Sequence, residues 1–412
     1  MISYKQFDNG LRLIVNKMDG LLSVSCGIMV KTGSANECEE ENGISHFIEH
    51  NLFKGTKTRT AFDISDYIDK IGAQINAYTS KETTCYYTKS TADHYEECLE
   101  VLSDIFFNSV FDEEELEKEK GVVIEEIKMS EDTPEDICLD LLAESRYGKK
   151  GLGRTILGPE RTVRKFSRQS ILDYMDKYYT ADNVIISVAG NVDIEKITNA
   201  VGRLFADNFT RFKSKAQVKS KFIKPQSLCK CKKIEQSHIA LSMPVFSMKD
   251  NRRDALVLAN YVLGGGMSSR LFQKIREEMG LCYSVYSYVS QYKDTGVCEV
   301  YAGVNTQMRD DALKAIVEEI QKFKNGITKS EFERGKEQIK SSFIFGEENT
   351  GSQMLLLGRY LLYFGEIFDF NERIDNINKV SFEDVSAVIN EFFDLNDCAL
   401  ATVGSKRSKL SI

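Results

Sequence analysis

The order of strand-like and helix-like segments in the first half of this 412-residue chain recurs in its second half. Residues 1–206 start with alternating, strand-like sequence, continue with helices around a pair of strands, and close with one more strand and helix. Residues 227–412 repeat strands, helices, a strand pair and helices before a last strand. Residues 207–226 lose the apolar periodicity, gain lysines and contain Pro225, which is typical of a linker. The repeat predicts two similar domains, one on each side of this linker.

Local signals place the individual segments. Asn9-Gly10 is a hairpin turn within strand-like sequence, and Thr60 is a helix cap before an amphipathic stretch that Gly72 ends. In the first half we expect strands at 3–31, 73–79, 83–88 and 183–189, and helices at 43–54, 61–71, 93–107, 112–130, 135–147, 163–179 and 194–205. In the second half we expect strands at 227–244, 283–304 and 398–403, and helices at 251–263, 269–278 and onward to residue 393.

Two of the chain's 4 histidines lie four residues apart with a glutamate between them, in His46-Phe47-Ile48-Glu49-His50. On a helix, His46, Glu49 and His50 share one narrow face, and an apolar stripe covers the opposite side. Two neutral imidazoles one turn apart can bind a zinc ion, and a neighbouring carboxylate can serve as its general base. This H-x-x-E-H pattern is typical of metallopeptidases. The alternative is a pair of surface histidines beside a solvated glutamate.

A catalytic zinc site needs a third protein ligand and one open position. The acidic segment 112–128 is expected to be a helix, and on it Glu119 and Glu126 border the apolar stripe, whereas Glu125 points to solvent. Because two helical turns separate Glu119 from Glu126, one carboxylate can bind the metal while the other orients a histidine. For most other carboxylates in this segment, a solvated helix face is the better interpretation.

These motifs resemble the insulinase and mitochondrial-processing-peptidase family of zinc peptidases, particularly its short bacterial members. The resemblance rests on the segment GISHFIEHNLFKGT, residues 43–56, and on Glu126, which lies 126 − 50 = 76 positions after His50. Asn51 departs from the family pattern, which usually has an apolar residue there, but it replaces no ligand.

The resemblance implies a fold, a metal and a set of roles. The fold is α+β, with two similar domains that each consist of a mainly antiparallel sheet packed with helices. One Zn²⁺ is expected per chain, because the second half has no H-x-x-E-H. The implied roles are metal binding for His46, His50 and Glu126, general base for Glu49, and a supporting carboxylate for Glu119.

Substrate contacts are expected on the strand at 73–79. If this strand lies at the edge of its sheet, it can receive an extended peptide by strand addition. The resemblance implies that Asn76, with its neighbour Ala77, contacts the bound chain. The alternative is an interior strand in which Asn76 only satisfies a turn.

The segment 263–288 of the second half joins three glycines to a helix and a strand. It lacks the G-K-[ST] ending of a phosphate-binding loop, so nucleotide binding is rejected. The resemblance implies that Arg276 and Tyr283 reach the active site, where a guanidinium and a phenol can donate to substrate carbonyls or to a developing oxyanion. Without that context they would be interpreted as a surface arginine and a core tyrosine.

Composition excludes several classes of protein. A net charge of −8 argues against nucleic acid as a partner. The longest apolar runs are far shorter than the roughly 20 residues that span a bilayer. The first twenty residues resemble a strand rather than a signal peptide. The 10 cysteines are scattered, apart from Cys229-x-Cys231. We expect most of them to be small core residues in a reducing compartment, so we place the protein in the cytoplasm. His94 and His238 have no ligand-like neighbours.

The sequence thus predicts a zinc-dependent metalloendopeptidase that cuts peptides or small unfolded proteins. In longer relatives the arginine–tyrosine pair comes from the half of the chain without zinc, so the resemblance implies a homodimer in which each subunit completes the other's site. The alternative is a catalytically idle peptide-binding or scaffold protein. A structural or storage site would need four protein ligands, and the sequence offers three in suitable phase.

Overall fold

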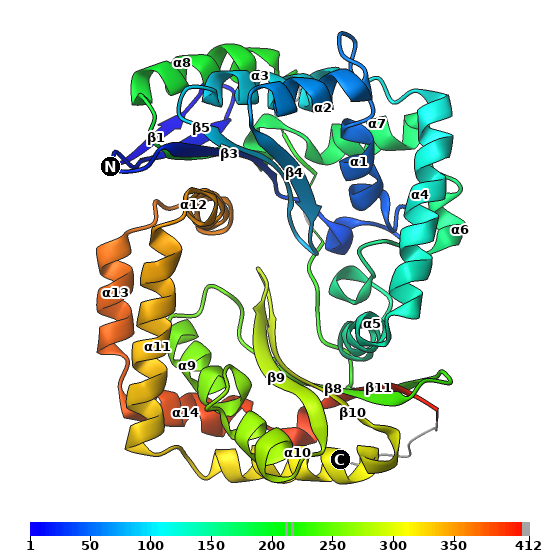
Figure 1. The fold of residues 1–412 in the computed structure, drawn as a ribbon, viewed down its shortest axis with the longest axis vertical. Coiled ribbons are helices and arrows are strands. Elements are labelled where there is room, and N and C mark those ends of the chain that lie inside the picture. Colours follow the sequence, from blue (N-terminus) through cyan, green and yellow to red (C-terminus); the bar gives the residue numbers. More distant parts are fainter. Residues whose placement is uncertain (211–212, 216–217, 406–412) are drawn as a thin grey trace. The chain divides into compact units, whose positions relative to one another are not determined.

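The computed structural model describes residues 1–210, 213–215 and 218–405, and these form two compact units (Figure 1). Unit 1 comprises 1–127, 155–218 and 344–368, and unit 2 comprises the rest. Parts of the expected linker, residues 211–212 and 216–217, lie outside the described residues, as do residues 406–412 of the expected second domain. The domain boundaries at 206 and 227 stay a prediction.

Unit 1 is built on a six-stranded sheet with the order β1-β2-β6-β3-β5-β4. The strands are β1 (Ile2–Gln6), β2 (Arg12–Lys17), β3 (Ser23–Val30), β4 (Gln74–Thr79), β5 (Thr84–Thr91) and β6 (Val184–Gly190). Neighbouring strands run antiparallel except β2 and β6, which are parallel. The predicted hairpin turn at Asn9-Gly10 is confirmed: Asn9 Oδ1 accepts from the Leu11 amide at 3.0 Å, and Gly10 has a φ of +94°.

Helices cover both faces of this sheet (Figure 1). They are α1 (Ile44–Leu52), α2 (Ala61–Lys70), α3 (Tyr95–Asn108), α4 (Glu113–Asp132), α6 (Glu160–Val163), α7 (Arg168–Tyr178), α8 (Ile194–Leu204) and α12 (Thr350–Phe364). The main core of unit 1 lies between one face and α1, α3 and α7. Helix α12 packs on the other face, where Gly27 leaves room for Met354 and Gly358 leaves room for Met29.

One predicted helix of unit 1 is wrong. The apolar pattern predicted a single helix over 163–179, but α6 ends at Val163 and α7 begins only at Arg168. Ser167 starts the second helix by capping it: its hydroxyl accepts from the Ser170 amide at 3.2 Å, and the Ser170 hydroxyl accepts from the Ser167 amide at 2.8 Å. A residue that caps a helix has an extended backbone, so the first helix has no continuation through this position.

Unit 2 has a five-stranded sheet with the order β7-β11-β8-β10-β9. The strands are β7 (Ser227–Cys231), β8 (Gln236–Val245), β9 (Cys282–Gln291), β10 (Gly296–Asn305) and β11 (Ala399–Gly404). The helices are α5 (Pro134–Tyr147), α9 (Arg253–Gly264), η5 (Phe272–Glu278), α10 (Arg309–Lys324), α11 (Lys329–Glu347), α13 (Phe370–Lys379) and α14 (Phe382–Phe392). Strands β7 and β11 are parallel, and the other neighbours are antiparallel.

The two sheets share one topology. Adding five to each strand number converts the order β2-β6-β3-β5-β4 of unit 1 into the order of unit 2, and the single parallel pair falls at the same place in both. The predicted α+β fold with an internal repeat is therefore confirmed. In this topology β4 and β9 are equivalent edge strands.

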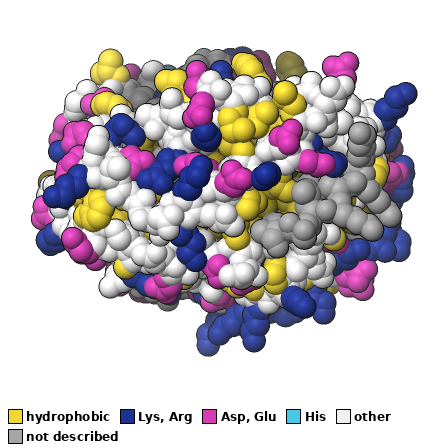
Figure 2. All heavy atoms as spheres, turned by 90° about the horizontal axis from the view of Figure 1, so that it is seen from below, with side chains coloured by type: hydrophobic (Ala, Val, Ile, Leu, Met, Phe, Trp, Pro, Cys, Tyr) yellow, Lys and Arg dark blue, Asp and Glu magenta, His cyan; other side chains and the backbone are white. Residues whose placement is uncertain are grey.

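The distribution of surface charge and the character of the helices are relevant to nucleic acid and membrane partners. Figure 2 shows basic and acidic side chains interspersed over one face of the molecule. None of the helices in the described residues combines the length and the apolar character that crossing a bilayer requires.

Candidate metal centre and active site

Helix α1 begins at a buried acidic cap. The Glu37 carboxylate accepts from the backbone amides of Gly43 at 2.7 Å and Ser45 at 2.9 Å, and from Asn42 Nδ2 at 3.0 Å. Gly43 precedes the helix with a φ of +98°, in the left-handed region that glycine adopts without strain. Burial raises the pKa of Glu37, although these hydrogen bonds oppose the rise. The amides at the start of α1 are thus satisfied within the protein interior.

The two predicted faces of α1 are confirmed. Its apolar face is fully buried in the core of unit 1 and consists of Ile44, Phe47, Ile48 and Leu52. His46 is also buried, whereas Glu49 and His50 are half-buried on the same side of the helix. The apolar face therefore fixes the helix, while the opposite face offers two imidazoles and a carboxylate.

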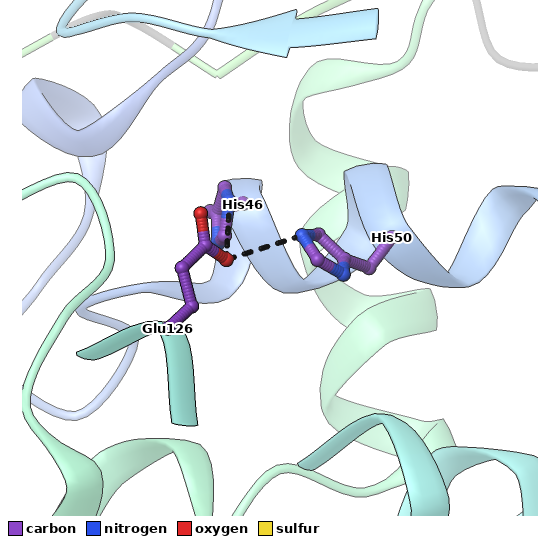
Figure 3. Close-up of side chains that lie close together, drawn as sticks. All are labelled: His46, His50 and Glu126. Atoms are coloured by element: carbon purple, nitrogen blue, oxygen red, sulfur yellow. Dashed lines mark ion pairs between the residues drawn. The ribbon is translucent and has the colours of Figure 1, made fainter. Parts of the chain in front are cut away.

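His46 and His50 of α1 and Glu126 of α4 point toward one another (Figure 3). Glu126 Oε2 lies 3.6 Å from His46 Nε2 and 3.5 Å from His50 Nε2. One ligand atom from each of the three residues lies within 4.8 Å of the others. Ligand atoms on a tetrahedral zinc ion with bonds of 2.0–2.1 Å are about 3.3 Å apart. The two distances to Glu126 are close to this spacing, so the three side chains form a group that can hold a metal ion.

Glu119, which lies two turns before Glu126 on α4, contacts His50. Its Oε2 lies 3.1 Å from His50 Nδ1, and its Oε1 lies 2.6 Å from the Lys54 ammonium. The carboxylate is buried, which favours a higher pKa, but the hydrogen bonds from His50 and Lys54 outweigh burial and lower the pKa of Glu119. Helical phase selected two carboxylates. Glu126 contacts Nε2 of both histidines, and Glu119 contacts Nδ1 of His50.

The two histidines have opposite protonation behaviour without a metal. Burial, together with the charge of His50, lowers the pKa of His46 to about 4. Burial acts to lower the pKa of His50 as well, but its hydrogen bonds to Glu119 and Glu126 prevail and raise the pKa to about 9. The hydrogen bond from His50 lowers the pKa of Glu126. At neutral pH the metal-free site therefore holds one neutral imidazole, one imidazolium and two carboxylates.

Glu49 lies on the same face and is held by the edge strand. The hydroxyl of Thr79, the last residue of β4, donates to Glu49 Oε2 at 2.5 Å. Burial raises the pKa of Glu49, and the Thr79 hydrogen bond partly offsets the rise. Neither Thr79 nor Lys54 was predicted as a site residue, although Thr79 lies in the strand expected at 73–79 and Lys54 in the helix expected at 43–54. The signal for Lys54 was its position one turn after His50.

Strand β4 is an edge strand of its sheet, as the strand-addition hypothesis requires. Asn76 is exposed, and its Oδ1 accepts from the Ala77 amide at 2.8 Å. A cavity of about 490 Å³ lies beside the first half of the strand, between Gln74–Asn76 and the α2 residues Ser65 and Asp69. That Asn76 and Ala77 bind substrate stays a prediction.

Arg276 and Tyr283 lie together in unit 2. The Arg276 guanidinium on η5 lies 4.6 Å from the centre of the Phe272 ring and 5.2 Å from that of Tyr283. Tyr283 is 80% exposed, so the interpretation as a core tyrosine is wrong. That this pair reaches a metal site stays a prediction.

The remaining histidines have ordinary partners. His94 lies 3.1 Å from Glu97, and His238 Nδ1 lies 2.7 Å from the Tyr301 hydroxyl. Among the described residues, His46, His50 and Glu126 form the single group of three possible metal ligands.

Two models of one peptidase family match most of the chain. The family model described as "Insulinase (Peptidase family M16)" matches residues 14–160, and the model described as "Peptidase M16 inactive domain" matches residues 165–339. This chain belongs to peptidase family M16. The match to the inactive domain covers most of the half that has no H-x-x-E-H.

The relatives of this chain match it over nearly its whole length. It is 42% identical over 404 residues to "Uncharacterized zinc protease YmxG" of Bacillus subtilis (strain 168), with 98% of both chains covered. It is 36% identical over 388 residues to an "Uncharacterized zinc protease" of Rickettsia felis, with 93% of both covered. The solved structure "The crystal structure of a protease from Helicobacter pylori" shares the fold with a TM-score of 0.92 at 23% identity, over 98% of this chain and 99% of that one.

Proposed function

We propose that this M16 protein is a zinc-dependent endopeptidase that hydrolyses peptides or small unfolded proteins. The observation that carries the proposal is the convergence of His46, His50 and Glu126, with the Glu49 carboxylate beside them on α1. Three ligands leave a fourth position open, as catalytic zinc sites do. The names of the relatives, zinc proteases of uncharacterised activity, support the same reaction class.

In the proposed mechanism, His46, His50 and Glu126 would hold the zinc ion, which would act as a Lewis acid and lower the pKa of water at the site. Glu49 acts as general base: it takes a proton from the attacking water and gives it to the leaving amine. Thr79 holds Glu49 Oε2, so the other carboxylate oxygen is available for the proton. The raised pKa of Glu49 brings it closer to neutral pH, where transfer in both directions is efficient.

The substrate is proposed to bind as an added strand beside β4. The free edge of β4 offers backbone groups to an extended chain, which makes binding largely independent of sequence. Asn76 and Ala77 would contact that chain. Because Thr79 ends the same strand and donates to Glu49, a peptide paired with β4 would run toward the general base.

Cleavage of an internally quenched fluorogenic peptide tests the proposal. We expect activity in the zinc-loaded protein, loss on chelation, recovery on adding zinc, and loss of at least about 10²-fold in Glu49→Gln. Glu125→Gln changes an exposed carboxylate on α4 and is the matched control, with unchanged activity. A wild-type protein that binds the peptide and leaves it intact would support the idle scaffold instead.

The proposed homodimer has its own test. Arg276 and Tyr283 of the partner subunit would donate to the substrate at each metal centre. In that case the inactive variants Glu49→Gln and Arg276→Ala, mixed and allowed to exchange subunits, regain up to about a quarter of the wild-type activity, because half of the dimers then hold one intact site. No gain on mixing, or a fully active monomer in light scattering, contradicts the arrangement.

The metal and the compartment are proposed on chemical grounds. Two imidazoles and a carboxylate suit Zn²⁺, although manganese or cobalt can use the same ligands, so metal analysis of the protein as purified decides. All 10 cysteines lie in the described residues and are free, which supports a reducing compartment such as the cytoplasm.

A further inference from the structure

Lys54 is linked to the metal centre through one buried carboxylate. Its ammonium lies 2.6 Å from Glu119 Oε1, and the other oxygen of Glu119 lies 3.1 Å from His50 Nδ1. The Glu119 side chain is 6% exposed, and the contacts with Lys54 and His50 occupy both of its oxygens. Lys54, Glu119 and His50 therefore form a continuous chain of charged hydrogen bonds that ends at a proposed metal ligand.

The backbone places Lys54 and His50 on the same side of Glu119. Helix α1 ends at Leu52, but the chain continues its turn, and the Lys54 amide donates to the Asn51 carbonyl at 3.2 Å. Lys54 thus follows His50 by four residues, the spacing that brings two side chains to one side of a helix. Both reach across to α4 and hold opposite oxygens of the same carboxylate.

His46 has no comparable support. Its Nδ1 is buried and has no hydrogen-bond partner among the described residues, whereas the equivalent atom of His50 faces Glu119. A histidine that binds metal through Nε2 is normally held by a hydrogen bond from its Nδ1–H, which fixes the ring and the tautomer. Among the described residues, a hydrogen bond of this kind is present at His50 and absent at His46.

Burying a carboxylate without a partner costs free energy of desolvation. The Glu119 carboxylate must also be oriented so that one of its oxygens accepts from His50 Nδ1. Lys54 supplies the balancing charge and binds Oε1, which leaves Oε2 to accept from His50. A surface ion pair would contribute little, but the burial of Glu119 removes most of the competition from water. Removing the ammonium leaves a buried carboxylate with one partner, free to rotate away from the imidazole.

We infer that Lys54 is a positioning residue of the metal centre, which holds Glu119 in the orientation that presents His50 Nε2 to the metal. The inference rests on the proposed zinc site and adds a residue to it. Its role is to set the affinity for the metal, so the effect is measurable without any peptide substrate.

The test is zinc affinity, measured by competition with a chromophoric chelator. We expect Lys54→Met to weaken zinc binding about tenfold, at the lower end of the effect of removing a partner behind a ligand. Lys57→Met, which changes an exposed lysine three residues further along the same loop, is the matched control and leaves affinity within about twofold. Lys54→Arg keeps the charge and restores most of the affinity.

A double-mutant cycle separates positioning from a general loss of structure. If Lys54 acts through Glu119, Lys54→Met has no further effect on zinc affinity in a Glu119→Gln background. Equal, additive losses in both backgrounds, or an unchanged affinity in Lys54→Met, overturn the inference. If Lys54→Met fails to fold, Lys54→Gln takes its place in the same cycle.

A spectroscopic readout follows the tautomer directly. With only 4 histidines in the chain, the ¹⁵N signals of His50 are assignable, and the zinc-loaded protein should show a protonated Nδ1 in slow exchange with solvent. In Lys54→Met this proton should exchange faster. A wild-type protein that binds no zinc would overturn both the proposed function and this inference, whereas one that binds zinc without cleaving peptide would fail only the former.

Discussion

Zinc binding should displace protons in an amount set by His50. Its two carboxylate partners raise its pKa to about 9, while burial holds that of His46 at about 4. At pH 8 the metal-free protein therefore carries about 0.9 proton on His50 and almost none on His46. Two ordinary histidines with pKa values near 6.5 would carry about 0.06 proton together. Because both imidazoles must be neutral to bind metal, the proton on His50 has to leave.

The number of protons is measured by isothermal titration calorimetry of the metal-free protein at pH 8 in buffers of different ionisation enthalpy. Water at the open position of the site releases protons as well, so the informative quantity is the difference between wild type and Glu119→Gln. The variant loses one of the two partners that raise the pKa of His50. On binding zinc, we expect it to release fewer protons than the wild type, with a difference of more than about half a proton. The same release in both proteins would refute the reasoning.

The sign of the pH dependence follows from the same pKa. Below about pH 9 the imidazolium of His50 competes with zinc, so the apparent affinity should rise about tenfold per pH unit between roughly pH 6 and 8. An affinity that levels off above pH 7 would mean that His50 titrates as an ordinary histidine.

Three further predictions concern stability, each measured by denaturant or thermal unfolding. Glu37→Ala leaves the amides that begin α1 buried without an acceptor and should cost about 1–3 kcal/mol, and a loss below about 0.5 kcal/mol would show that water replaces the carboxylate. Gly43→Ala places a Cβ 2.4 Å from the Leu157 carbonyl oxygen at a φ of +98°, so it should cost more than Gly72→Ala, which has open space and only the roughly 1 kcal/mol of a left-handed backbone. The hydrogen bonds of Arg270 outweigh burial and hold the pKa of Glu331 at about 2, so this pair stabilises the fold above about pH 4.5 and loses its effect as the pH falls toward 2. In Arg270→Met the free energy of unfolding should therefore depend less on pH between about 2 and 4.5. The same pH dependence in the variant and the wild type would contradict this prediction.

The parts of the fold that the sequence predicted correctly depend on local order. The faces of α1 follow from residue spacing alone, and each residue of its apolar face is fully buried. The cap at Thr60 and the turn at Asn9-Gly10 were also correct, because each depends on hydrogen bonds between residues a few positions apart. The helix expected over 163–179 was wrong because the apolar periodicity continues through Ser167, whereas the capping interaction of Ser167 starts a new helix there.

Contacts between distant segments explain what the sequence left open. Thr79 lies 30 positions from Glu49, and the local sequence of neither residue predicts the hydrogen bond between them. The position of β4 at the edge of the sheet likewise depends on the pairing of all six strands of unit 1. The sequence could state only the condition under which a peptide would bind there.

The choice between Glu119 and Glu126 shows where helical phase stops being informative. Seven residues make almost two full turns, so the two carboxylates project in nearly the same direction from α4 and phase selects both. They are about 10 Å apart along the helix axis, and the position of α4 beside α1 decides which of them contacts which histidine atoms. In the structure it brings Glu126 to Nε2 of both histidines, and it brings Glu119 to Nδ1 of His50 and to Lys54. Two chemically identical side chains thus acquire different proposed roles, metal ligand and supporting carboxylate, from their displacement along one helix.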